Sequence, residues 1–134
     1  MFISDGEKET QPVTILHVED NQMVADAVKE TLELEGWIVE STAEGTTALE
    51  MILSEAHYDV LIFDNELPGV SGLELICETR QIPRRQQTPI IMLTASDVER
   101  EARCNGANAF LRKPEEITLI TETIARLLAR QRKS

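Results

Sequence analysis

Apolar residues gather in four short runs along the chain, and each run ends beside a reactive side chain. The runs are Thr14–Val18, Val60–Phe63, Pro89–Leu93 and Ala109–Arg112. They are followed by Glu19 and Asp20, by Asp64, by Thr94 and by Lys113. Continuous apolar runs of this length, rich in Ile and Val, are typical of buried parallel strands.

Between these runs the apolar positions change to helical spacing. Helices are predicted over Met23–Glu35, Thr46–Ser54, Ser71–Arg80, Asp97–Asn105 and Glu115–Arg130. Ser71 and Glu74 form a capping box at the start of the third helix. The third strand is expected over Tyr58–Asp64, and a further short strand over Trp37–Glu40. Five consecutive β/α units predict an α/β fold, a doubly wound five-stranded parallel sheet with helices on both faces.

The length of 134 residues predicts a single domain. We expect residues 1–12 to form a flexible lead-in and residues 13–130 the folded domain. A basic tail is expected over residues 131–134. The apolar fraction of 42% is ordinary for a soluble globular protein.

Charge and hydropathy exclude two classes of partner. The net charge is −11, so nucleic acid should not bind this domain, because phosphate contacts need clustered Lys and Arg. The basic cluster near the end is better explained by the preference of cations for a helix C-terminus; its members are Arg126, Arg130, Arg132 and Lys133. No apolar stretch reaches the length of about 20 residues that a membrane helix needs. The first residues also lack a signal sequence, so a cytoplasmic location is the default expectation.

The side chains after the strands suggest phosphoryl chemistry. The carboxyl ends of parallel strands share one edge of the sheet, where open α/β folds place their sites. An aspartate such as Asp64 can attack an electrophile and form an acyl phosphate. Carboxylates suit Mg²⁺, while Lys113 and Thr94 can contact phosphoryl oxygens. Each residue alone has a simpler explanation as a turn former, a helix cap or a solvated strand end. The five together favour a phosphoryl site.

These residues resemble the receiver domain of two-component response regulators over about residues 13–130. The resemblance lies in four stretches: Leu16–Asn21, Leu61–Gly72, Met92–Ala95 and Gly106–Pro114. The spacings 64 − 20 = 44 and 94 − 64 = 30 are similar to those of such domains. The resemblance implies the flavodoxin-like, chemotaxis-receiver-like sheet order 2-1-3-4-5.

The resemblance also implies the site and its cofactor. Asp64 would be the phosphoacceptor. Mg²⁺ would be held by Asp20, by Asp64 and by the backbone carbonyl of Glu66, with Glu19 acting mainly through water. Thr94 and Lys113 would contact the phosphoryl group.

A switch is implied as well. Thr94 would move toward the phosphoryl group, and Phe110 would be the aromatic residue that turns inward with it. An aromatic residue at the end of a strand is more often ordinary core, which is the alternative for Phe110. The resemblance further implies a cis peptide bond before Pro114.

The implied partners are a sensor histidine kinase or a histidine phosphotransfer protein as donor, and a downstream protein that the sequence does not identify. The face of the fourth helix, fifth strand and fifth helix could also carry a homodimer lined by Leu119 and Thr123, although both could be ordinary helix residues. The sequence therefore predicts a signalling module with weak self-dephosphorylation, not an enzyme.

The chain departs from the family pattern in three places. Glu19 replaces the commoner aspartate of the acidic pair. Glu66 is either an exposed loop acid or a group that changes the lifetime of the phosphoryl group. The interval from Thr94 to Lys113, 113 − 94 = 19 residues, is shorter than family members usually show, and the loss is expected in the fourth helix or its leading loop.

Two rival functions remain open at this point. A Mg²⁺-dependent phosphohydrolase would form the same aspartyl phosphate, but haloacid-dehalogenase-type phosphatases carry an Asp general acid where this chain has Glu66. A degenerate receiver that only scaffolds is disfavoured by the complete acceptor set. Turnover of a small phosphate ester would favour the first rival, and full function of Asp64→Asn the second.

Overall fold

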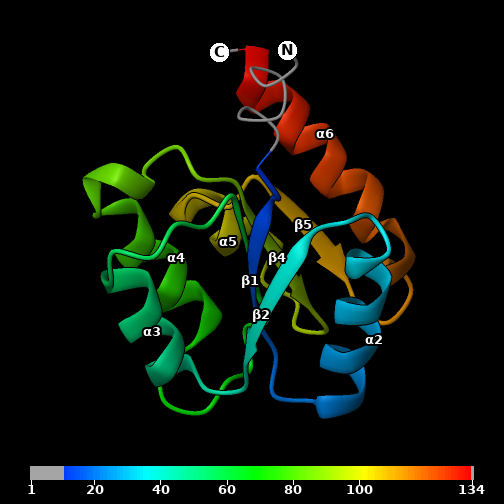
Figure 1. Cartoon of the computed structure of the whole chain (residues 1–134). Helices are drawn as coiled ribbons and strands as arrows, with labels where there is room; N and C mark the ends of the chain where they lie inside the picture. The colour runs from blue at the N-terminus through cyan, green and yellow to red at the C-terminus, as the bar shows by residue number, and fades with distance from the viewer. Residues whose placement is uncertain (1–10, 134) are drawn as a thin grey trace, which may run out of the picture.

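Five strands and five α-helices alternate along the chain in the computed structural model, which describes residues 11–133 (Figure 1). Most of the predicted lead-in and the final residue of the predicted tail lie outside the described residues. The strands are β1 Thr14–Val18, β2 Ile38–Thr42, β3 Val60–Phe63, β4 Ile90–Thr94 and β5 Ala109–Arg112. The α-helices are α2 Gln22–Glu33, α3 Gly45–Leu53, α4 Gly72–Arg80, α5 Glu99–Asn105 and α6 Ile120–Lys133. Short 3₁₀ helices lie at Pro83–Arg85 and Ile117–Leu119.

The strands form one parallel sheet in the order β2-β1-β3-β4-β5. This order confirms the predicted fold class. β1 and β3 are central, and their register pairs Val18 with Phe63. The residues that follow these two strands therefore lie side by side at the carboxyl edge of the sheet.

Helices cover both faces of the sheet, as its apolar strands require. α2 and α6 lie on one side, and α3 and α4 on the other (Figure 1). Along β1 the side chains alternate between the faces: Ile15 packs in the cluster with α2 and α6, and Leu16 packs in the cluster with α3, α4 and α5. Both residues are completely buried. This period of two is the one expected of a strand with a core on each face.

Side-chain caps mark the starts of two helices, and each helix begins within one residue of its predicted start: α2 at Gln22 and α4 at Gly72. Asn21 caps α2 by accepting a hydrogen bond from the backbone N–H of Val24. Ser71 and Glu74 form the predicted capping box of α4, in which each side chain accepts from the backbone N–H of the other residue.

The last two helices differ from their predicted bounds. α5 begins at Glu99 instead of Asp97 and has only seven residues. The location of the shortened interval stays a prediction. α6 begins at Ile120 instead of Glu115, because a turn closed by Glu116 N–H and Arg112 O comes first. It continues to Lys133, so the predicted tail is helical over residues 131–133.

Candidate functional site

Asp64 directly follows β3 and is fixed by the strands on either side. Its backbone N–H donates to Val18 O at 3.0 Å. The Asp64 side chain is 5% exposed. The start of α4 presses against it, since a Cβ atom at Gly72 would collide with the backbone oxygen of Asp64. Asp64 is therefore held at the carboxyl edge in a restricted position.

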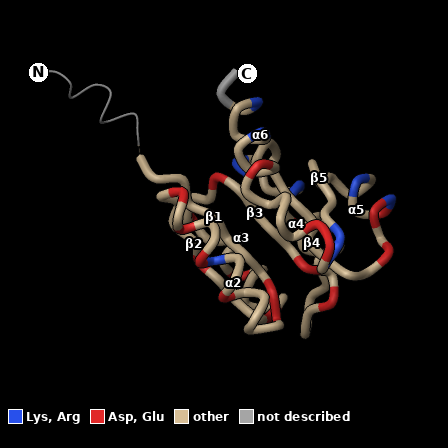
Figure 2. Tube along the Cα trace, turned by 90° about the vertical axis from the view of Figure 1, so that its right-hand side faces the viewer, with Lys and Arg blue, Asp and Glu red and all other residues tan. Residues whose placement is uncertain are grey.

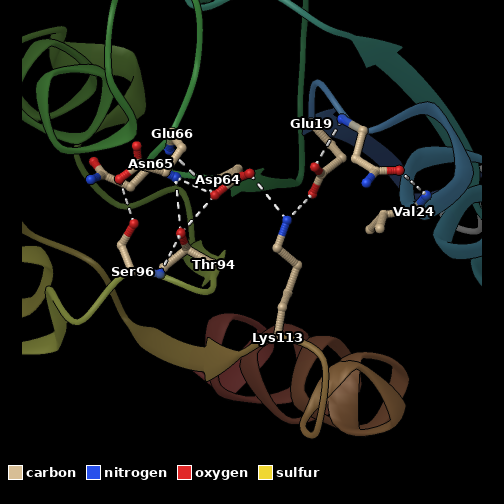
Figure 3. Close-up of polar contacts among 9 residues, drawn as sticks. Glu19, Val24, Asp64, Asn65, Glu66, Thr94, Ser96 and Lys113 are labelled. Atoms are coloured by element: carbon tan, nitrogen blue, oxygen red, sulfur yellow. Dashed lines mark hydrogen bonds and ion pairs between the residues drawn. The ribbon is translucent and has the colours of Figure 1, made fainter.

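One oxygen of the Asp64 carboxylate faces β4. Asp64 Oδ1 accepts from the Thr94 hydroxyl at 2.6 Å and from the Asn65 backbone N–H at 2.7 Å (Figure 3). Thr94 is the last residue of β4 and is completely buried. Hydrogen bonds to an ionised oxygen are roughly twice as strong as neutral ones, so Thr94 is held on this carboxylate.

The other oxygen of Asp64 faces Lys113, which directly follows β5. Lys113 Nζ lies 3.1 Å from Asp64 Oδ2 and 2.7 Å from Glu19 Oε1 (Figure 3). The Lys113–Pro114 peptide bond is cis. Burial disfavours charge on Lys113, but the hydrogen bonds to Glu19 and Asp64 outweigh it and raise the pKa of Lys113 above its ordinary value.

Glu19 and Asp20 supply the acidic side of the site from the end of β1. Their carboxylate oxygens and one of Asp64 lie within 4.8 Å of one another. The two acids differ in surroundings, since Glu19 is 2% exposed and Asp20 is exposed. Burial raises the pKa of Glu19, while its hydrogen bond with Lys113 opposes this rise. Direct contact with the ammonium favours the charged form of both partners at neutral pH.

A hydrogen bond joins two loops at the mouth of the site. The Ser96 hydroxyl donates to Glu66 Oε2 at 2.6 Å (Figure 3). Glu66 lies in the loop after β3 and Ser96 in the loop after β4. Glu66 is exposed, so it lies at the surface near Asp64 and outside the buried cluster.

A buried histidine lies directly below the site on β1. His17 is 1% exposed, and among the described residues neither ring nitrogen has a hydrogen-bond partner. Burial, together with the nearby Lys113 ammonium, lowers the pKa of His17 to about 4. The imidazole is therefore neutral near pH 7.

Phe110 is a residue of β5. It is 8% exposed and packs in the core with α3, α4 and α5. The Arg112 guanidinium lies 5.5 Å from the centre of its ring. Arg112 also pairs with the exposed Asp97 at 3.3 Å. The aromatic side chain is thus inward in this structure.

The structure brings together the side chains predicted from the strand ends: Glu19, Asp20, Asp64, Thr94 and Lys113. Asn65, Ser96 and His17 were not predicted as residues of the site. Ser96 carried a signal, since it lies two residues after Thr94, in one of the loops that the shared carboxyl edge of the sheet brings together.

The fold and this constellation define a receiver domain. The family model described as the response regulator receiver domain matches residues 15–125. The chain therefore belongs to the receiver domains of two-component response regulators, a family of signalling modules. The family predicted from the sequence motifs is confirmed.

Similar proteins include regulators and solved receiver domains. The phosphate regulon transcriptional regulatory protein PhoB of Rhizobium meliloti (strain 1021) is 41% identical over 100 residues, which are 72% of this chain and 44% of that protein. The chemotaxis response regulator CheY4 of Vibrio cholerae is 30% identical, with a TM-score of 0.80 over 87% of this chain and 99% of the other.

A third similar structure is the receiver domain of the sensor histidine kinase PA1611 from Pseudomonas aeruginosa PAO1, which has a magnesium ion coordinated in its active site cleft. It is 26% identical, with a TM-score of 0.80 over 89% of this chain and 99% of that chain. The chain spans about half the length of the curated relatives it matches. Among the helices of residues 11–133, none is long and apolar enough to cross a membrane.

Proposed function

We propose that Asp64 accepts a phosphoryl group from a phosphohistidine of a sensor kinase or a phosphotransfer protein. One observation carries the proposal: the Asp64 carboxylate contacts the Lys113 ammonium and the Thr94 hydroxyl on different oxygens, beside the acids of β1. A buried carboxylate between a cation, a hydroxyl donor and further carboxylates suits phosphoryl transfer better than any structural task.

The chemistry would proceed by in-line attack. A carboxylate oxygen of Asp64 forms the new O–P bond, the N–P bond of the phosphohistidine breaks, and the imidazole leaves with its electron pair. Lys113 balances charge on the equatorial oxygens, and the Thr94 hydroxyl can donate to one of them. Because Thr94 already contacts Asp64 Oδ1 at 2.6 Å, its proposed move toward the phosphoryl group is short.

The acidic cluster fits Mg²⁺, which prefers oxygen ligands and retains several waters. Asp20 and Asp64 would hold the ion directly with the backbone carbonyl of Glu66, and Glu19 mainly through water. Asp20 is suited to this role because it is exposed and, among the described residues, makes no hydrogen bond or ion pair. When bound, Mg²⁺ neutralises charge on the transferring oxygens.

The output would be a change in a protein-binding surface. The phosphoryl group adds negative charge within reach of Thr94 and Lys113, which can bias two arrangements of α5, β5 and α6. Phe110, whose ring is already inward in this structure, would be the aromatic switch residue whose surroundings change when Thr94 moves. Later hydrolysis would reset the domain, and this weak self-directed reaction does not make it an enzyme.

The remaining assignments are part of the same proposal. Residues 13–130 would be the receiver unit, located in the cytoplasm and without nucleic acid bound through this domain. A homodimer through α5, β5 and α6 would use Leu119, which is 38% exposed. The expectation that Thr123 lines this contact is wrong, because Thr123 is 3% exposed and its hydroxyl donates to Leu119 O.

Incubation with acetyl phosphate and Mg²⁺, followed by intact mass measurement, tests the proposal. The expected result is the mass of one phosphoryl group on the parent protein and none on Asp64→Asn. Equal labelling of both proteins would refute Asp64 as the acceptor. Repeated turnover of a small phosphate ester would instead favour a phosphohydrolase.

A further inference from the structure

A pocket of about 220 Å³ lies at the amino edge of the sheet, where the strands begin. Pro89, just before β4, and Asn108, just before β5, both line it. The C-terminal half of α6, which carries several Lys and Arg residues (Figure 2), forms another wall. Gln131 Nε2 of this helix donates to Gln87 O at 2.9 Å. This hydrogen bond holds α6 against the segment before β4, so the pocket is formed without a ligand.

The lining of this pocket is cationic and rich in amides. Its polar side chains are guanidinium groups and carboxamides, from Arg80, Arg130, Gln86, Gln87, Asn108 and Gln131. Within residues 11–133, no Asp or Glu lines it. This is unusual for a chain with 24 acidic and 13 basic residues. A concave surface that carries cations and no anions concentrates negatively charged ligands.

Arg80 gives the pocket a fixed positive charge. Its guanidinium donates only to neutral oxygens, which belong to Arg85, Gln86, Thr88, Gly106 and Asn108. Burial lowers the pKa of Arg80, and no carboxylate in the described part of the chain offsets this effect. The guanidinium nevertheless stays charged at neutral pH. Since its five donors are already used, Arg80 contributes charge and a rigid wall to the pocket.

Hydrogen-bond donors for a ligand come from the rest of the lining. The side-chain amides of Gln86 and Gln87 are exposed and make no hydrogen bond to any other described residue. The Arg130 guanidinium lines the pocket from α6. Guanidinium and amide N–H groups are the donors that bind the oxygens of phosphates and carboxylates. The lining therefore combines a fixed charge with donors suited to an oxyanion.

We propose that this pocket binds a small oxyanion with two or more negative charges, a phosphate ester or a polycarboxylate. Arg130, Gln86 and Gln87 donate to its oxygens, in the positive field of Arg80. The ligand is small, because drug-sized ligands occupy pockets of about 300 to 1,000 Å³. The pocket shares no residue with the phosphoacceptor site, so the proposal is independent of the chemistry at Asp64.

NMR titration of the isotope-labelled protein tests the proposal. The probes are pyrophosphate and citrate, each without Mg²⁺, and sodium chloride at equal ionic strength is the control. The side-chain amide resonances of Gln86 and Gln87 should shift to saturation with a Kd on the order of 1 mM. The probe with the lower Kd distinguishes a phosphate from a carboxylate ligand. Shifts without saturation, or shifts confined to the carboxyl edge around Asp64, would overturn the proposal.

Matched variants separate this pocket from general surface charge. Arg130→Gln removes a donor and a charge, and Gln86→Glu places a carboxylate in the lining. Each should raise the Kd of the better probe about tenfold. The controls Arg126→Gln and Gln81→Glu make the same charge changes at exposed positions outside the lining, and should raise it less than about threefold. An equal rise in the pocket variants and their controls would refute a specific site. Arg80 is left unchanged, because its loss would remove the donors of several carbonyls.

Discussion

Charged residues lie at both edges of the sheet, but the groups that they contact differ. At the carboxyl edge, carboxylates meet the single ammonium of Lys113. At the amino edge, Arg80 and Arg85 meet backbone carbonyls. Arg80 donates to Gly106 O at 2.8 Å and to Thr88 O at 2.8 Å. Most Lys and Arg residues lie on the side that carries α5 and α6 (Figure 2).

The comparison teaches that a functional site and a structural cluster differ in the hydrogen-bond partners of their charged side chains, and not in charge alone. Arg85 is 3% exposed, stacks 5.2 Å from the centre of the Tyr58 ring and donates to Ile52 O at 2.7 Å and Ala56 O at 2.6 Å. Its guanidinium therefore binds carbonyls near the end of α3 and in the segment before β3. Asp20 in contrast makes no side-chain bond within residues 11–133, so it is available to a ligand.

Removing a charge from the carboxyl edge should abolish chemistry and spare the fold. Asp20→Asn should lower Mg²⁺-dependent labelling on the order of 1000-fold, because a direct metal ligand contributes several kcal/mol to transition-state charge stabilisation. Initial rates with acetyl phosphate measure the effect. Asp97→Asn is the control, since Asp97 is 94% exposed and lies outside the acidic cluster. Similar rates for the two variants would show that Asp20 does not hold the metal.

Removing a charge from the amino edge should destabilise the fold and leave the chemistry unchanged. Arg85→Met should lower the free energy of unfolding by about 3 kcal/mol, because buried carbonyls lose charged donors. The labelling rate per folded molecule should remain that of the parent. Denaturant unfolding measures the first quantity. Arg84→Met is the matched control, since Arg84 is exposed and donates to Leu53 O and Ser54 O. A larger loss in Arg84→Met would contradict the contrast.

His17 offers a pH test of the region below the carboxyl edge. Its pKa is about 4 in the folded state and 6.5 ordinarily, so between these values the unfolded chain binds a proton that the folded chain does not. Protonation of His17 therefore leaves the free energy of unfolding unaffected above pH 6.5. As the pH falls from 6.5 toward 4, it lowers the free energy of unfolding by up to about 3 kcal/mol.

The variant His17→Leu should flatten this dependence. Denaturant unfolding at several pH values, with the exposed His57→Gln as control, measures the difference from the parent. If the curves of His17→Leu and the parent run parallel between pH 4 and 6.5, His17 does not titrate as described.

The smallest effect is expected at the mouth of the site. Glu66→Ala and Ser96→Ala each remove the 2.6 Å hydrogen bond between the loops, and both should change the dephosphorylation rate a few-fold, on the order of 1 kcal/mol. Loss of phosphoryl group after removal of the donor measures this rate. Rates equal to the parent in both variants would leave Glu66 as an ordinary exposed acid.

Periodicity predicted most of the fold because the inner strands β1, β3 and β4 are buried on both sides. Val60–Phe63 is apolar throughout and Ile90–Thr94 is apolar up to its last residue, so they stand out without knowledge of their neighbours. The bounds of α6 could not be predicted, because the turn from Pro114 to Glu116 depends on a hydrogen bond back to Arg112. The sheet order came from family resemblance, since periodicity does not specify which strands are adjacent.

The site was predictable where residues directly follow strands, because the shared edge brings them together. The Glu19–Lys113 contact was not, since it joins residues 94 apart and depends on side-chain length. Arg85 was equally hidden: its partners are backbone carbonyls about 30 residues away, which carry no mark in the sequence.

Locating the phosphoryl group within the chain tests the central claim most directly. Borohydride reduces an aspartyl phosphate to homoserine, and peptide mass spectrometry after labelling with acetyl phosphate and Mg²⁺ identifies the converted position. The account predicts homoserine at position 64 alone. Conversion at position 19, 20 or 66, or no conversion in a protein that has gained the phosphoryl mass, would contradict it.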